Sequence, residues 1–106
     1  MQPTAEQFTE QAWSSIVSAQ KLAQQNKHQQ LEEEHLLISL VKNDGLATNI
    51  LKTANISIDT LIKETEFSLR KQPIMKSQPE SVYIGKGLNQ LLEDANNYKQ
   101  SLLDDF

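Results

Sequence analysis

The stretch from Leu31 to Val41 constrains the fold more than any other part of the chain. Three consecutive glutamates stand near its start, and carboxylates favour the first turn of a helix, where unpaired N–H groups carry partial positive charge. An almost wholly apolar run follows, with leucine and valine at the spacing of one helical face. Ile38 widens that face to nearly the whole circumference. The stretch therefore predicts a short helix that other helices must cover on most sides.

The segments on either side of this stretch also carry helical patterns. Before it, apolar residues step by three or four positions, which predicts a long amphipathic helix over residues 5–25 with Thr4 as its N-cap. After it, Asn43-Asp44-Gly45 is a turn signal in which the glycine can take a positive φ. A short third helix is expected to follow this turn and to close near Asn55.

The second half of the chain predicts two more helices joined by a linker. Ser57 can cap the first of them, which must end before Pro73 because the residue preceding a proline disfavours the helical conformation. Residues 72–81 are polar and lack periodicity, so they read as a surface linker. Residues 82–84 can form a short extended segment, and a fifth helix follows with leucines from Leu88 to Leu102. Since no strand pattern of any length appears, the predicted fold class is all-α, a small domain of about five helices.

The apolar positions that fall in phase on four successive helices predict the core. A chain of 106 residues is long enough to bury one core and no more. The predicted core positions are Phe8, Ala12, Ile16, Ala19, Leu36, Leu37, Leu40, Ile50, Leu51, Leu61 and Ile62.

Composition narrows the classes of function. The net charge is −4, and the basic residues are scattered, whereas binding to phosphate backbones needs clustered positive charge, so we expect no nucleic-acid partner. Cysteine is absent, which excludes disulfides and thiolate metal sites. No apolar run approaches the ~20 residues needed to span a bilayer, and the first residues lack the pattern of a secretory signal. We therefore expect a cytoplasmic protein without a membrane partner.

The polar residues offer little catalytic chemistry. His28 and His35 are the only histidines, and they lack the further ligands that a zinc site needs at defined spacing. We expect His35 to bond a neighbouring loop from inside the packing, and His28 to lie solvated in a polar turn. Glu32-Glu33-Glu34 has two interpretations, stabilisation of a helix start or an acidic docking patch.

Several aromatic and aliphatic residues are candidates either for the core or for a binding surface. Trp13 and Val17 form an i,i+4 pair beside the stripe of the first helix. A broad stripe can bury them, or they can line an apolar groove, since partly exposed aromatic residues are typical binding anchors. Tyr98, Leu102 and Phe106 near the end of the chain carry the same ambiguity.

A series of short motifs resembles the amino-terminal repeat domain of the Clp family. Their order and spacing are most similar to those of the ClpB group of AAA+ disaggregases, and the resemblance covers essentially the whole chain. The motifs of the first repeat are Phe8-Thr9-Glu10-Gln11-Ala12, Ala19-Gln20, Glu34-His35-Leu36-Leu37 with Leu40, Gly45-Leu46-Ala47 and Ile50-Leu51. The join and the opening of the second repeat are similar to Gln72-Pro73, Val82-Tyr83 and the helix from Leu88 to Ala95.

The resemblance implies a division of the chain into three parts. Residues 1–71 would form the first repeat, residues 72–81 the linker and residues 82–106 an incomplete second repeat. The family's second Glu-His-Leu-Leu-like helix has no counterpart in these 106 residues, so the domain is expected to be truncated. The leucine stripe of the fifth helix would then lack its cover, and we expect the chain to self-associate.

The resemblance also implies a function. It points to the substrate-binding amino-terminal domain of a ClpB-like, ATP-dependent protein disaggregase, which captures exposed apolar segments of unfolded or aggregated proteins. The alternative is an adaptor-docking or regulatory domain of a Clp protease ATPase. ATP and Mg²⁺ would belong to the parent protein's hexameric AAA+ ring. The 106 residues contain no Gly-x4-Gly-Lys-Ser/Thr loop, so we expect them to hold no cofactor and not to be an enzyme.

The candidate substrate-binding residues come both from the residue pattern and from the family resemblance. In the family an acidic residue at the position of Asp104 is implicated in substrate contact, and Thr4 lies near a family contact threonine. The full candidate set is Trp13, Val17, Tyr98, Asp104, Phe106 and Thr4.

Overall fold

The computed structural model confirms the all-α class. It describes the chain except residues 1–3, 5, 7, 44 and 105–106, and of residues 103 and 104 it describes the backbone alone. Five helices and two very short strands follow one another along the chain. They are α1 (Glu10–Gln25), β1 (Gln30–Leu31), α2 (Glu33–Asn43), α3 (Gly45–Thr53), α4 (Ile58–Leu69), β2 (Tyr83–Ile84) and α5 (Lys86–Asp104).

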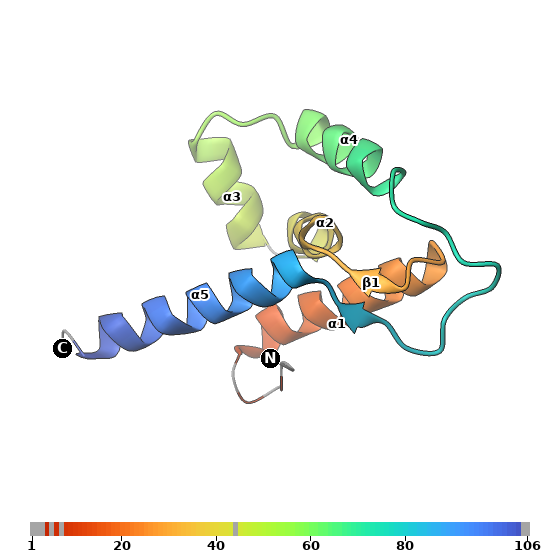
Figure 1. Ribbon diagram of the computed structural model, residues 1–106. Coiled ribbons are helices and arrows are strands. Elements are labelled where there is room, and N and C mark those ends of the chain that lie inside the picture. The colour runs from red at the N-terminus through yellow and green to blue at the C-terminus, as the bar shows by residue number, and fades with distance from the viewer. Residues whose placement is uncertain (1–3, 5, 7, 44, 105–106) are drawn as a thin grey trace.

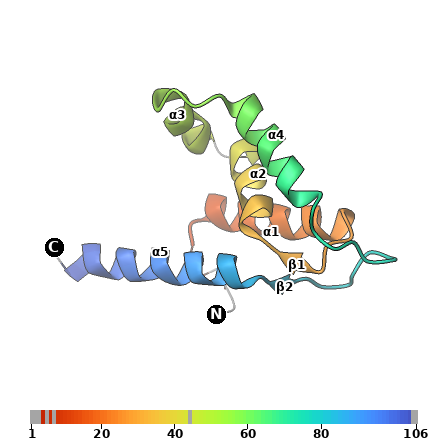
Figure 2. The same ribbon diagram turned by 45° about the horizontal axis from the view of Figure 1, so that its top comes forward.

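The central position predicted for the Leu31–Val41 stretch is confirmed. Helix α2 contacts α1, α3, α4 and α5. In Figures 1 and 2, α2 lies between α4 on one side and α1 on the other, and α3 and α4 form the far layer. Helix α5 runs beside the start of α1 and then continues past it, so that its C-terminal half projects from the body of the molecule.

The two strands fix the beginning of α5. They pair in parallel, with Gln30 opposite Tyr83 and Leu31 opposite Ile84. The N–H of Gly85 donates to the carbonyl of Leu31 at 2.8 Å. The extended segment expected at residues 82–84 is therefore present as β2 over its last two residues. Its partner β1 was not predicted, because two residues are too short to show an alternating pattern.

Helix α1 begins later than predicted. Its N-cap is Thr9, whose Oγ1 accepts a hydrogen bond from the N–H of Ala12 at 3.1 Å, and the assignment of Thr4 as the cap is wrong. Phe8, just before the cap, stacks on Trp13 with ring centroids 6.1 Å apart. An apolar pair at these two positions is a hydrophobic staple, which fixes the entry of the chain into a helix. This staple, together with the Thr9 cap, explains the start at Glu10.

Two helices are followed, two residues after their ends, by a residue with positive φ, and neither residue is a glycine. Lys27 has a φ of 61° after α1, and Asn55 has a φ of 66° after α3. After each, the following N–H reaches back five residues, from His28 to Ala23 and from Ile56 to Leu51, which is the Schellman arrangement. The positive φ expected at Gly45 is wrong: none of the three glycines, all of them described, has one, and Gly45 is the first residue of α3.

Part of the predicted core is shifted. Ile16 and Ala19 are buried as predicted, but Leu36, Leu37 and Leu40 are only half-buried and Ile50 is exposed. The core assignment of Ile50 is wrong because its helix, α3, contributes no buried residue to the core. The main buried cluster instead joins α1, β1 and α5 and consists of Ala19, Ala23, Leu31, Leu88 and Leu92, with Phe8, Leu36, Val82 and Ile84 packed against it.

Candidate functional site

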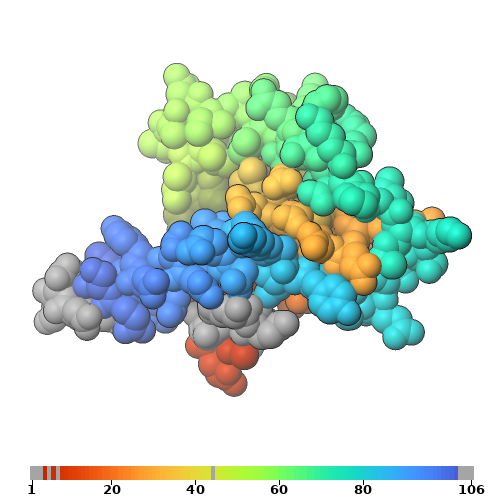
Figure 3. Space-filling view, in the orientation of Figure 1, coloured from red at the N-terminus to blue at the C-terminus, as the bar shows by residue number. Residues whose placement is uncertain are grey.

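One face of α5 exposes an apolar strip. Leu91, Ala95, Tyr98 and Leu102 recur at intervals of four, three and four residues, so they lie on one side of the helix. All four are exposed, Leu91 by 45%, Tyr98 by 68% and Leu102 by 43%. We call these four residues the exposed strip. Figure 3 shows α5, in blue, extending along one edge of the molecule.

The adjoining face of α5 holds the helix in place. Leu88 is 2% exposed and Leu92 is 8% exposed, both within the main cluster. The single leucine stripe predicted for this helix therefore splits, because Leu88 and Leu92 turn inward while Leu91 and Leu102 turn outward. The signal that could have found the strip is the 4-3-4 spacing of residues 91, 95, 98 and 102.

The three glutamates of the central stretch lie at helix starts. Glu33 and Glu34 occupy the first turn of α2. The carboxylate of Glu32 lies where a Cβ on Gly85 would stand, which places it at the beginning of α5. Burial, followed by the charges of Glu34 and Glu33, raises the pKa of Glu32. The hydroxyl of Ser68 also donates to Oε2 of Glu34 at 3.4 Å. These positions match the helix-start interpretation of the three residues.

The predicted site residues are distributed over both ends of the chain. Trp13 and Val17 are half-buried on α1, and Tyr98 lies in the exposed strip on the projecting half of α5. Thr4 is exposed. The backbone of Asp104 ends α5, its side chain is not described, and Phe106 lies outside the described residues. The structure thus brings Tyr98 together with Leu102, and it gives no contact between Tyr98 and Trp13 among the described side chains.

The two histidines form a buried pair. Nδ1 of His28 lies 2.9 Å from Nε2 of His35, and the N–H of Glu32 donates to Nδ1 of His35 at 2.9 Å. The prediction that His35 bonds a neighbouring loop from inside the packing is confirmed. The prediction of a solvated His28 is wrong, since this residue is 4% exposed. It is drawn inward because the Schellman turn at Lys27 directs the chain back over the end of α1.

Burial sets the protonation of this pair. The pKa of His35 is lowered to about 4, mainly by burial and in second place by the neighbouring His28. Burial also lowers the pKa of His28. Both rings are therefore neutral near pH 7. Among the described residues no group of three potential metal ligands comes together.

Comparison with known proteins decides the family. The sequence pattern of the Clp repeat (R) N-terminal domain matches residues 7–106. The chain belongs to the Clp N-terminal repeat-domain family. It is 47% identical over its whole length to chaperone protein ClpB 1 of Parasynechococcus marenigrum (strain WH8102). It is 43% identical to chaperone protein ClpB 1 of Synechococcus elongatus (strain ATCC 33912 / PCC 7942 / FACHB-805), again over its whole length.

The match covers a small part of each relative. The chain spans 12% of the length of these ClpB proteins, and it is similar to their N-terminal regions. This Clp N domain contains, within its described residues, no helix long and apolar enough to cross a membrane.

Proposed function

We propose that this Clp N domain is the substrate-binding amino-terminal domain of a ClpB-like, ATP-dependent protein disaggregase. It captures exposed apolar segments of unfolded or aggregated proteins in the cytoplasm. The parent protein's AAA+ modules, assembled as a hexameric ring, use ATP and Mg²⁺ to act on the captured chain. The family membership and the identity to ClpB proteins support this proposal.

The observation that carries the proposal is the exposed strip. An unfolded polypeptide offers apolar side chains in no fixed order, so its receptor needs an apolar surface and few directional bonds. The strip supplies this surface over three turns of α5, with Tyr98 as an aromatic anchor. Trp13, stacked on Phe8 near the start of α1, is a second candidate anchor. Such contact is weak and tolerant of sequence, which lets the captured chain be released.

The test is a titration of the ¹⁵N-labelled domain followed by NMR. The ligand is a reduced and carboxymethylated protein that stays unfolded, and its disulfide-intact folded form is the control. We expect the unfolded form to shift the amide signals around Tyr98, Leu102 and Trp13, and the folded form to shift none. Equal binding of the folded form would favour the alternative, an adaptor-docking domain, and would contradict the proposal.

A matched pair of variants locates the surface. Tyr98→Ser removes the aromatic ring of the strip, and Tyr83→Ser removes a ring of similar exposure on β2, outside the strip. We expect Tyr98→Ser to weaken binding about tenfold, the loss of roughly 1.4 kcal/mol that one well-placed anchor supplies. Tyr83→Ser should leave binding unchanged. The proposal is wrong if the two variants bind equally well.

A further inference from the structure

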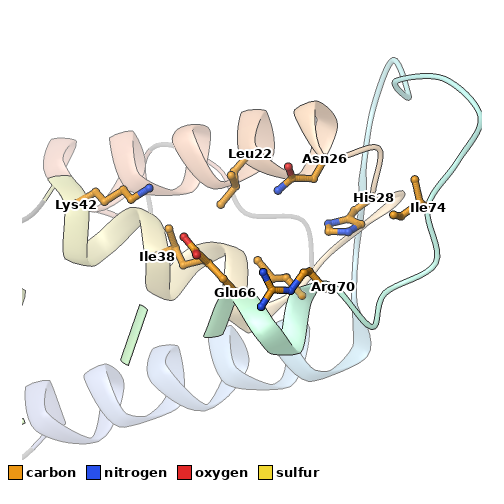
Figure 4. Close-up of a pocket in the computed structure, with 9 residues that line it drawn as sticks. Leu22, Asn26, His28, Ile38, Lys42, Glu66, Arg70 and Ile74 are labelled. Carbon is orange, nitrogen blue, oxygen red and sulfur yellow. The ribbon is translucent and has the colours of Figure 1, made fainter. Parts of the chain in front are cut away.

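A second recognition feature lies away from the exposed strip. A cavity of about 540 Å³ opens between α1, α2, α4 and the linker, and it shares no lining residue with the strip. Figure 4 shows its labelled side chains along one elongated space, from Lys42 at one end to His28 and Ile74 at the other. The lining residues are Leu22, Asn26, His28, Ile38, Lys42, Glu66, Leu69, Arg70 and Ile74.

The floor of this cavity is apolar. Ile38 of α2 and Leu69 of α4 are buried, and Leu22 of α1 is half-buried beside them. Ile74 of the linker stands at the rim and is largely exposed. A floor of three aliphatic residues suits one aliphatic side chain of a ligand, and Ile74 adds apolar surface at the rim.

The histidine pair directs one hydrogen-bond donor to the cavity. A backbone N–H can only donate, so Nδ1 of His35 accepts from Glu32 and the proton of neutral His35 sits on Nε2. That proton is donated to Nδ1 of His28. The proton of neutral His28 must then be on its own Nε2. This nitrogen has no partner among the described residues, and His28 lines the cavity, so the N–H is available to a ligand.

The charged groups of the cavity are also available. Lys42, Glu66 and Arg70 form no ion pair with one another or with another described residue, although all three line the same space. The guanidinium carbon of Arg70 lies 5.7 Å from the ring centroid of Phe67, and no hydrogen bond from its N–H groups to another described residue accompanies this contact. The cavity thus offers two cations and the His28 N–H to an anion, and one carboxylate to a donor.

We propose that this cavity binds the carboxyl-terminal residue of an extended polypeptide. The terminal carboxylate accepts hydrogen bonds from Arg70 and from Nε2 of His28. The last side chain, aliphatic, rests on Leu22, Ile38 and Leu69, and the backbone N–H of the same residue donates to Glu66. Capture of a terminal carboxylate is a known mode of peptide recognition; it uses backbone N–H groups in many proteins, and here the donors are side chains. An internal segment of a polypeptide lacks the carboxylate, and a small dicarboxylate lacks the apolar side chain.

This inference rests on the proposed function in one respect, that the ligand is an unfolded chain. The experiment compares two fluorescent peptides of one sequence that ends in leucine, one with a free carboxyl group and the other with a terminal amide. Fluorescence anisotropy measures their binding to the domain. We expect the amide to bind about tenfold more weakly, the loss that one charge-assisted hydrogen bond predicts. Equal binding of the two peptides would overturn the inference.

Two neighbouring cations provide the matched variants. Arg70 and Lys71 both lie over the ring of Phe67, but Arg70 alone lines the cavity. Arg70→Gln should remove the preference for the free carboxyl group, and Lys71→Gln should retain it. If both variants lose the preference equally, the effect is general electrostatic attraction and the inference is wrong.

The outcomes separate this inference from the proposed function. Tyr98→Ser, in the strip, should leave the preference for the free carboxyl group intact. If the two peptides bind alike while the unfolded test protein still binds through the strip, the proposed function stands and the inference fails. If the free-acid preference is present while the unfolded test protein does not contact the strip, the cavity is confirmed and the proposed function fails.

Discussion

The two halves of α5 carry the same kind of apolar spacing and have opposite surroundings. In the first half, Leu88 and Leu92 are covered by α1 and β1. The second half of the helix projects beyond α1, and its residues Tyr98 and Leu102 are exposed. Periodicity identifies a helix and its apolar face, but it does not state which neighbour covers that face. The same kind of spacing therefore serves stability on the inward face of the first half and, we propose, binding along the exposed strip, which begins at Leu91.

Truncating one leucine in each half tests this comparison with the largest expected effect. Leu88→Ala should lower the free energy of unfolding by about 2–5 kcal/mol, because it empties a closed site in the main cluster. Leu102→Ala should change it by less than about 0.5 kcal/mol, the usual range for a surface site. Urea denaturation followed by circular dichroism measures both. Equal losses in the two variants would show that the second half is covered in solution.

Self-association is one way in which the second half could be covered. The sequence predicted it because the leucine stripe of the fifth helix would lack its cover, and because a linker of this length would let that helix reorient. The structure restrains the linker instead: the N–H of Met75 donates to the carbonyl of Lys27 at 2.8 Å, and Nε2 of Gln24 donates to the carbonyl of Glu80 at 2.9 Å. We therefore expect α5 to keep its position. Because the strip is already exposed there, two strips can pair without a movement of α5. Sedimentation equilibrium of the domain and of its Leu102→Ser variant decides whether the strip pairs.

The sequence was sufficient for the elements with strong local signals. The central helix, the Ser57 cap and the end of α4 before Pro73 follow from local chemistry, and the structure has all three. The errors arose where distant segments decide. Leu31 enters the core because its strand pairs with β2, which lies far away in the sequence. His28 is buried because its ring pairs with that of His35 on α2. The cavity combines residues of three helices and two loops, so no local pattern could indicate it.

The buried pair of His28 and His35 predicts that acid destabilises the fold. With the pKa of His35 lowered from 6.5 to about 4, the unfolded chain binds more protons than the folded domain between these values. Stability is therefore complete above pH 6.5 and falls as the pH decreases. The expected loss is about 1.4 kcal/mol per pH unit, or about 3 kcal/mol over the window. The midpoints of urea denaturation, measured at a series of pH values, test this expected loss of stability.

A variant isolates this contribution from that of the carboxylates. His35→Asn keeps an acceptor for the N–H of Glu32 but removes the titrating ring. We expect the variant to be less stable at neutral pH and to lose less on acidification than the natural domain. Parallel pH profiles for the two proteins would mean that the pair does not control the acid response.

The smallest predicted effect concerns Ser15, a buried polar residue of α1. Here the substitution is expected to increase the free energy of unfolding, not to decrease it. Ser15 of α1 is fully buried, and its Oγ has no hydrogen-bond partner among the described residues. An unsatisfied buried hydroxyl costs free energy, and alanine favours the helix more than serine does. Ser15→Ala should therefore raise the free energy of unfolding by about 1 kcal/mol. Ser14→Ala, at an exposed position of the same helix, is the control, because it gains helix propensity alone. A loss of stability in Ser15→Ala alongside a gain in Ser14→Ala would show that Oγ is satisfied in solution, as a buried water would do.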